Sequence, residues 1–181
     1  LYNYFEGGKE DILLAIFDEI YDDLCGLVGA SFTDEAMEAH SIRSLFEDFI
    51  TACLSYYMDR QDLFMILVKE AHRMIFGDDD ARVAYFVGQH GRVVKALARP
   101  LALGMERGAL RPLPPEAVAH MLLGNINGCQ MQIFLERRSC PDKPTDAPAE
   151  AAAFLTQMLF DGLLADPQPA LHPNAQTERT D

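Results

Sequence analysis

Apolar residues recur every three or four residues along almost the whole chain. Within residues 9–30, Ile12, Ile16, Ile20 and Leu24 follow one another at intervals of four, and side chains spaced in this way share one face of an α-helix. No segment shows the apolar–polar alternation of a half-buried strand. The pattern predicts an all-α protein, a single helical-bundle domain of about six helices, at residues 9–30, 41–59, 61–75, 80–107, 115–137 and 148–164.

Residues with special roles at helix ends mark the boundaries of these helices. Ser41 can accept a hydrogen bond from a free backbone N–H of the first turn, and Asp80 favours the positive end of the following helix. Pro100 lies inside the fourth helix, where its missing N–H and its bulky ring predict a kink or a break. Gly108 is expected to end that helix, and the proline pair at 114–115 is expected to begin the next.

Acidic residues outnumber basic residues, most strongly in the first third of the chain. There are 28 acidic and 15 basic residues, and 14 of the acidic but only 3 of the basic residues precede residue 63. A nucleic-acid surface needs clustered Lys and Arg, so this stretch would repel DNA. No apolar run reaches the roughly 18 residues of a membrane span, and the four cysteines lack the spacing of a metal site or a disulfide frame. We therefore expect free thiols in a cytoplasmic protein that does not associate with a membrane.

The sequence contains no recognised catalytic motif. Glycine-rich phosphate loops, the zinc-protease motif and the serine nucleophile elbow are absent. The five histidines are scattered, with no two at a helical spacing of three or four residues. The acidic run at 78–80 lacks the alternating oxygen ligands of a calcium loop and suits a helix start instead. We expect no enzyme activity, no cofactor and no bound metal.

Two glycines interrupt the predicted fourth helix. Gly88 and Gly91 flank Gln89 and His90, and each glycine lowers helix stability by about 1 kcal/mol relative to alanine. They indicate either close packing against another helix or room for a ligand beside His90. In the second case the Gln89–His90 pair could orient the ligand by hydrogen bonding. The sequence leaves both interpretations open.

The predicted fifth and sixth helices carry more small and apolar residues than one packed face requires. Gly124 and Gly128 lie one helical turn apart, and the sixth helix is apolar almost all round. A helix with two apolar faces packs one on its own core and the other on a partner. We therefore predict a homodimer with a four-helix interface, with a monomer that has a thick core as the alternative. The residues predicted at this interface are Leu122, Gly124, Asn125, Gly128, Gln132, Ala152, Leu155, Met158, Leu159 and Gly162.

Residues 1–13, LYNYFEGGKEDIL, resemble the end of the DNA-binding domain of TetR-family transcription regulators. In that family a recognition helix ends in an L-Y-x-x-F pattern, and a Lys, an acid and an aliphatic residue open the next helix. Here three residues separate Phe5 from Lys9, one more than the commonest family spacing. The rest of the chain is similar to the family in its helices, in the G-A-L-R-P turn at 108–112 and in its two late apolar helices.

The resemblance implies a division of the chain and a function. Residues 1–8 would end a helix-turn-helix domain that mostly precedes Leu1, residues 9–165 would form a ligand-binding and dimerisation domain, and residues 166–181 a disordered tail. Tyr2, Tyr4 and Lys9 would contact DNA phosphates, because Tyr hydroxyls and a Lys near a helix N-terminus can fix register without reading bases. The protein would be a transcriptional repressor that binds operator DNA as a homodimer, through the missing N-terminal domain.

The same resemblance implies that a small hydrophobic or amphipathic effector in the helical core controls DNA binding. Abundant Met and Phe on the second to fifth predicted helices suit an adaptable apolar interior. The alternative function is a helical protein-interaction or dimerisation domain without a ligand or DNA role. The residues predicted to line the ligand pocket are Phe46, Phe49, Cys53, Tyr57, Phe64, Val68, His72, Phe86, His90, Val94, Asn127 and Met131.

Overall fold

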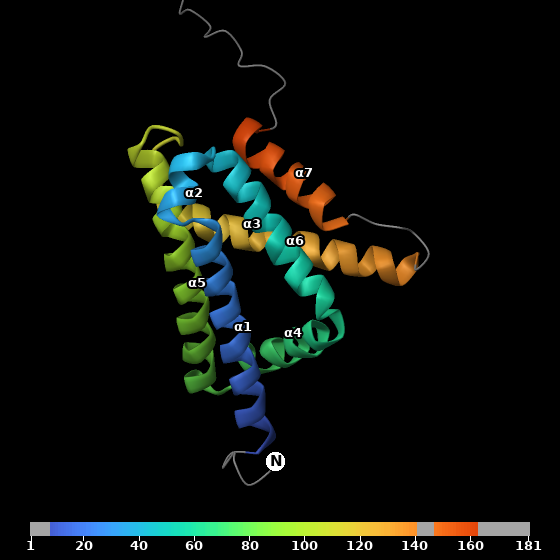
Figure 1. Ribbon diagram of the computed structural model, residues 1–181. Helices are drawn as coiled ribbons and strands as arrows, with labels where there is room; N and C mark the ends of the chain where they lie inside the picture. The colour runs from blue at the N-terminus through green and yellow to red at the C-terminus, as the bar shows by residue number, and fades with distance from the viewer. Residues whose placement is uncertain (1–7, 141–146, 163–181) are drawn as a thin grey trace, which may run out of the picture.

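The computed structural model describes residues 8–140 and 147–162, which form α-helices and, within those ranges, no strand (Figure 1). The all-α class expected from the periodicity is therefore confirmed. The segment 1–7, which includes Tyr2 and Tyr4, and the predicted tail at 166–181 lie outside the described residues. The helices are α1 (Lys9–Ser31), α2 (Asp34–Ala39), α3 (Ile42–Asp59), α4 (Gln61–Ile75), α5 (Asp80–Glu106), α6 (Pro115–Ser139) and α7 (Ala147–Asp161).

The short helix α2 was not expected from the sequence. Its six residues are too few to establish a helical repeat, whereas the other helices match the six predicted ranges closely. The hydroxyl of Thr33 caps α2 by accepting a hydrogen bond from the Ala36 N–H at 3.1 Å. Met37 is the buried residue of α2, so this helix adds one apolar side chain to the core.

The predicted helix ends follow the capping chemistry. The Ser41 hydroxyl accepts a hydrogen bond from the Ser44 N–H at 3.1 Å and so caps α3 as expected. Asp79, one residue before the expected start, caps α5 with its carboxylate. Gly108 follows α5 with a φ of 72°, a left-handed conformation that glycine adopts without steric penalty. Pro115 is the first residue of α6.

Helix α5 continues through Pro100, so of the two outcomes expected at that position, a kink or a break, the break is wrong. Leu97 and Leu101 on the same helix are 0% and 4% exposed, and α5 packs against α1 and α6. A proline inside a helix costs about 3 kcal/mol, while burial of each leucine contributes about 1.5–3 kcal/mol. The packing of α5 therefore outweighs the local preference of Pro100.

Helix α3 lies at the centre of the core. Its residues Phe49, Ile50 and Leu54 are at most 1% exposed, and the helix packs against α1, α6 and α7. In Figure 1, α1 and α5 run side by side, α7 lies along α3, and α4 crosses near the ends of α1 and α5 that lie closest to the N-terminus of the chain. Helices that cross in this way leave space at the junction of α1, α4, α5 and α6.

A row of polar contacts ties α1 to α5. The acidic residues that dominate the first third of the sequence accept hydrogen bonds here from Arg, Tyr and Gln side chains of α5. Gln89 therefore bonds to α1, so it does not act together with His90 in the ligand-orienting interpretation, one of the two that the sequence left open. The contacts join Arg82 to Glu10, Tyr85 and Gln89 to Asp18, and Arg92 to Asp22.

Candidate ligand cavity

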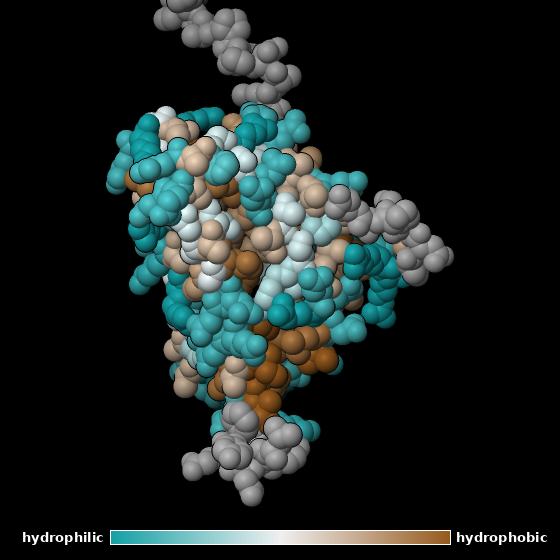
Figure 2. Space-filling model, in the orientation of Figure 1, coloured by the Kyte–Doolittle hydropathy of each residue, from teal (hydrophilic) through white to brown (hydrophobic). Residues whose placement is uncertain are grey.

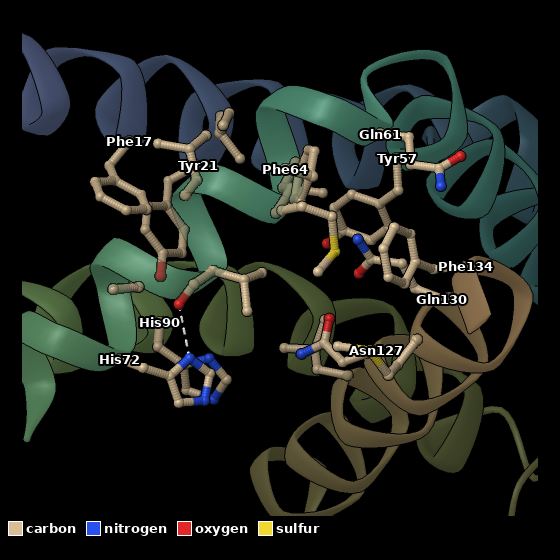
Figure 3. A pocket seen from close by; sticks show the side chains of 18 of the residues that line it. Phe17, Tyr21, Tyr57, Gln61, Phe64, His72, His90, Asn127, Gln130 and Phe134 are labelled. Atoms are coloured by element: carbon tan, nitrogen blue, oxygen red, sulfur yellow. Dashed lines mark hydrogen bonds between the residues drawn. The ribbon is translucent and has the colours of Figure 1, made fainter. Parts of the chain in front are cut away.

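A cavity of about 330 Å³ lies at the junction of α1, α4, α5 and α6, beside the C-terminal end of α3 (Figure 3). This volume is at the lower end of the range for small-molecule sites, about 300–1,000 Å³. In Figure 2 apolar side chains gather over the region where α4 passes α1. The lining residues are Phe17, Ile20, Tyr21, Leu24, Tyr57, Met58, Gln61, Phe64, Met65, Leu67, Val68, Ala71, His72, Ile75, His90, Val93, Leu123, Asn127, Gln130, Met131, Ile133 and Phe134.

The structure brings part of the predicted pocket together. Seven of the predicted pocket residues, which come from α3, α4, α5 and α6, line this one cavity. The predicted pocket residues that line it are Tyr57, Phe64, Val68, His72, His90, Asn127 and Met131.

Five predicted pocket residues lie elsewhere, and their assignment is corrected here. Phe49, Cys53 and Val94 are at most 2% exposed within the packed core, and Phe86 packs edge-on against Phe17 with ring centroids 5.0 Å apart. Phe46 lines a different cavity. Helical spacing identifies side chains that point inward, but the same spacing results whether they meet a void or another side chain.

The sequence analysis overlooked the contribution of α1. Phe17, Ile20, Tyr21 and Leu24 form one wall of the cavity, although the apolar stripe of this helix was visible in the sequence. On α6 a usable signal was present as well. Leu123, Asn127, Gln130 and Phe134 recur at i, i+4, i+7 and i+11, which places them on one face of the helix.

Two tyrosine hydroxyls face the cavity. Tyr57 is 6% exposed, and its hydroxyl has no hydrogen-bond partner among the residues that the structure describes. Burial raises the pKa of Tyr57 and also that of Tyr21. Both groups are therefore neutral phenols near neutral pH, each able to donate one hydrogen bond.

Polar side chains lie at two sides of the cavity. Figure 3 shows His72 and His90 on one side, and Gln61, Asn127 and Gln130 on the other. The Nδ1 atom of His72 lies 2.7 Å from the backbone oxygen of its own helix turn, at residue 68. A ligand of suitable length could therefore meet polar groups at both ends and apolar groups between them.

His90 joins α5 to α6. Its Nε2 lies 3.1 Å from Nδ1 of His120, with the ring centroids 5.1 Å apart. Burial, and then the neighbouring His120, lower the pKa of His90. The fold thus pairs two histidines that are thirty positions apart in the sequence.

The lining of the cavity suits binding by burial and hydrogen bonding. Among the described residues no Asp, Glu, Lys or Arg lines it, and no group of three or more His, Cys, Asp or Glu there is arranged to hold a metal ion. Burial raises the pKa of the Cys53 thiol to about 12, which leaves it protonated and poorly nucleophilic.

A second cavity of about 320 Å³ lies between α3, α5, α6 and α7. Its wall is almost entirely apolar, with the side chain of Arg111 as the exception. Leu122 and Leu159, both predicted at a dimer interface, line this cavity, and Leu159 is also 38% exposed.

The predicted interface residues divide between the core and the surface. Leu122, Ala152 and Leu155 are buried within the chain, so their assignment to an interface is corrected. Each lies on the face of its helix that packs on α3 or its neighbours, and burial in the core leaves nothing for a partner to contact. Met158 is partly buried, and the exposed members of the set are Gly124, Asn125, Gly128, Gln132, Leu159 and Gly162.

The exposed members on α6 form a continuous stripe with large apolar residues. Met121 and Leu135 lie on the same face of the helix and are 67% and 54% exposed. A Cβ atom added at Gly124 or Gly128 would meet no atom within 4 Å. The same holds at Gly88 and Gly91, so close packing against the described residues does not explain any of these four glycines.

Fold and cavity together define an all-α protein with a partly open cavity of ligand size. No protein-family model, curated protein or solved structure matches this chain. Within the described residues, none of the helices has the length and apolar character needed to cross a membrane.

Proposed function

We propose that residues 9–165 form the ligand-binding and dimerising part of a ligand-responsive transcriptional repressor similar to the TetR family. The cavity of about 330 Å³ carries this proposal, because α1 forms one of its walls. Helix α1 directly follows the segment that resembles the end of a DNA-binding domain. A ligand in the cavity therefore contacts the helix that leads to that segment.

Helix α1 lies between the cavity and the polar row on α5. On one face Phe17, Ile20 and Tyr21 line the cavity, and on another Asp18 and Asp22 accept hydrogen bonds from α5. A ligand that fits better when α1 tilts will favour the tilted state by its difference in affinity for the two states. The DNA-binding domains of the two subunits must lie about 34–36 Å apart to contact two half-sites one helical turn apart, and a tilt of α1 would change this spacing.

Lys9 is suited to a phosphate contact. It is the first residue of α1 and is exposed, and the positive end of the helix dipole adds to its charge. The resemblance assigns Tyr2 and Tyr4 to the same role, although both lie outside the described residues. The acidic residues of α1 repel the phosphates of DNA, so the proposal assigns no base reading to the described helices.

The exposed stripe on α6 supports the homodimer. Gly124 and Gly128 leave room for a second backbone, and Met121 and Leu135 supply apolar area that the described residues do not cover. Such a surface favours burial against a second copy. Phe154 of α7, 60% exposed, adds further apolar area beside α6.

A matched pair of glycine substitutions tests the interface. Gly128→Arg places a long charged side chain in the stripe, while Gly26→Arg makes the same change on α1, where an added Cβ also meets nothing within 4 Å. We expect sedimentation velocity to show dimers for the native chain and Gly26→Arg, and monomers for Gly128→Arg. A dimeric Gly128→Arg variant, or a monomeric native chain, would contradict this interface.

Ligand binding separates the proposed function from the alternative, an interaction domain without a ligand. We expect a thermal-shift screen of lipophilic compounds to yield specific stabilisers, since a ligand at 100 times its Kd stabilises by about 2.7 kcal/mol. A dimeric chain that no compound stabilises would favour the interaction domain.

A further inference from the structure

Acidic and basic side chains other than histidine are absent from the described lining of the cavity, although the protein is strongly acidic. The chain carries a formal net charge of −13, yet no ionic side chain other than histidine is found among the cavity-lining residues that the structure describes. Three carboxylates that neighbour the lining residues in the sequence of α1 are engaged outside the cavity. Asp18 accepts hydrogen bonds from Tyr85 and Gln89, Asp22 pairs with Arg92, and Asp23 accepts from Tyr56 at 2.7 Å.

Tyr57 provides a specific polar anchor in this neutral wall. Its side chain is almost wholly buried, yet its hydroxyl bonds to no other described residue. The Tyr57 hydroxyl is not among the fully buried polar atoms and stays open to the cavity. A ligand oxygen placed against this hydroxyl would accept a hydrogen bond with a net contribution of about 0.5–1.5 kcal/mol, which gives the site a preference for molecules with a hydrogen-bond acceptor.

We propose that the cavity takes an uncharged lipophilic molecule that carries a hydroxyl or carbonyl oxygen, and that the Tyr57 hydroxyl donates a hydrogen bond to this oxygen. The inference rests on the proposed function and specifies its ligand class. The aromatic rings of Phe17 and Phe64 and the aliphatic side chains between them enclose the apolar body. Gln130 and Asn127 lie on the same side of the cavity as Tyr57 in Figure 3 and offer further neutral hydrogen-bonding groups.

Charged ligands of the same shape are disfavoured by desolvation. A carboxylate inside the cavity would meet no Lys or Arg, and an ammonium would meet no Asp or Glu, among the described lining residues. Burial of an unpaired ion is far more costly than burial of a hydroxyl. Ring faces attract cations by about 0.5–2 kcal/mol, which does not replace the lost hydration of an ammonium group.

Three compounds with the same ten-carbon chain test the charge preference. We would measure the affinities of 1-decanol, decanoate and decylammonium by calorimetry at pH 8, above the ordinary titration range of histidine. The expected order places 1-decanol at least about tenfold tighter than either ion. Tighter binding of decanoate or of decylammonium would overturn the inference while leaving a ligand-binding function in place.

Two adjacent tyrosines provide a matched control for the anchor. Tyr57→Phe removes the hydroxyl that faces the cavity, and Tyr56→Phe removes one that donates to Asp23 outside it. We expect Tyr57→Phe to weaken 1-decanol binding about five- to tenfold and Tyr56→Phe to leave the affinity unchanged. Equal affinities in both variants would refute the role of Tyr57.

Failure of the inference and failure of the proposed function give different results. If none of the three compounds binds, and no stabiliser emerges from the lipophilic screen, then the cavity is not a ligand site and both proposals fall. If a charged member binds most tightly, only the ligand class is wrong.

Discussion

Substitution of Ala71 by leucine should affect stability and ligand binding in opposite directions. Ala71 lies on α4, lines the cavity and is partly buried against the core. Leucine adds three carbon atoms, each contributing about 0.8 kcal/mol when fully buried, which sets a ceiling of about 2 kcal/mol. Because the site is only partly buried, we expect Ala71→Leu to raise the free energy of unfolding by about 1 kcal/mol and Tm by about 2–4 °C.

The same added side chain occupies space that a ligand needs. We expect Ala71→Leu to weaken binding of 1-decanol by about tenfold. Differential scanning calorimetry without ligand and titration calorimetry with ligand measure the two effects on one sample. The matched control is Ala119→Leu on α6, a site that is 0% exposed and lines neither cavity.

Overpacking should destabilise Ala119→Leu by about 1–3 kcal/mol. If Ala71→Leu lowers Tm as the control does, then the space beside α4 is filled in solution and the reasoning from the cavity fails. If Ala71→Leu raises Tm but leaves the affinity unchanged, the ligand binds elsewhere.

Two further predictions concern titration and a buried hydroxyl. Because the pKa of His90 is lowered by burial and by His120, the unfolded chain takes up the proton first as the pH falls below about 6.5. The free energy of unfolding should therefore fall as the pH is lowered from 7.5 to 5.5. Thermal denaturation over this range should show a smaller fall in His90→Gln than in the exposed control His40→Gln. Equal falls in the two variants would contradict the assignment. Thr156 is 0% exposed, and its hydroxyl has no hydrogen-bond partner among the described residues, so Thr156→Val should raise the free energy of unfolding by about 1 kcal/mol in urea denaturation. A decrease would show that this hydroxyl has a partner in solution.

Local chemistry made most of the fold predictable, and tertiary packing decided the rest. The hydroxyl of Ser41 and the proline pair at 114–115 act within one helical turn, so their effects could be read from the sequence. The passage of α5 through Pro100 could not, because it depends on burial of leucines against α1 and α6. The helix at 34–39 has too few residues for a periodic signal.

The cavity was harder to predict than the helices that enclose it. Spacing placed Phe49 and Val94 on inward faces, but only the crossing of α4 over its neighbours determines which inward side chains meet a void. The pairing of His90 with His120 depends on the register between α5 and α6. The assignment of Leu122 to an interface failed for the same reason. Helix α6 has two apolar faces, and helical spacing does not tell which of them packs on the core.

Selection of DNA by the full-length gene product tests the proposed repressor function most directly. The product, with any residues encoded before Leu1, would be offered a pool of random duplexes at physiological salt, with and without the tightest-binding compound of the lipophilic screen. We predict enrichment of inverted repeats whose half-sites are about one or more helical turns apart, and loss of that enrichment at saturating ligand. A pool that stays random without ligand, or enriched sites that saturating ligand leaves bound, would contradict a ligand-controlled repressor.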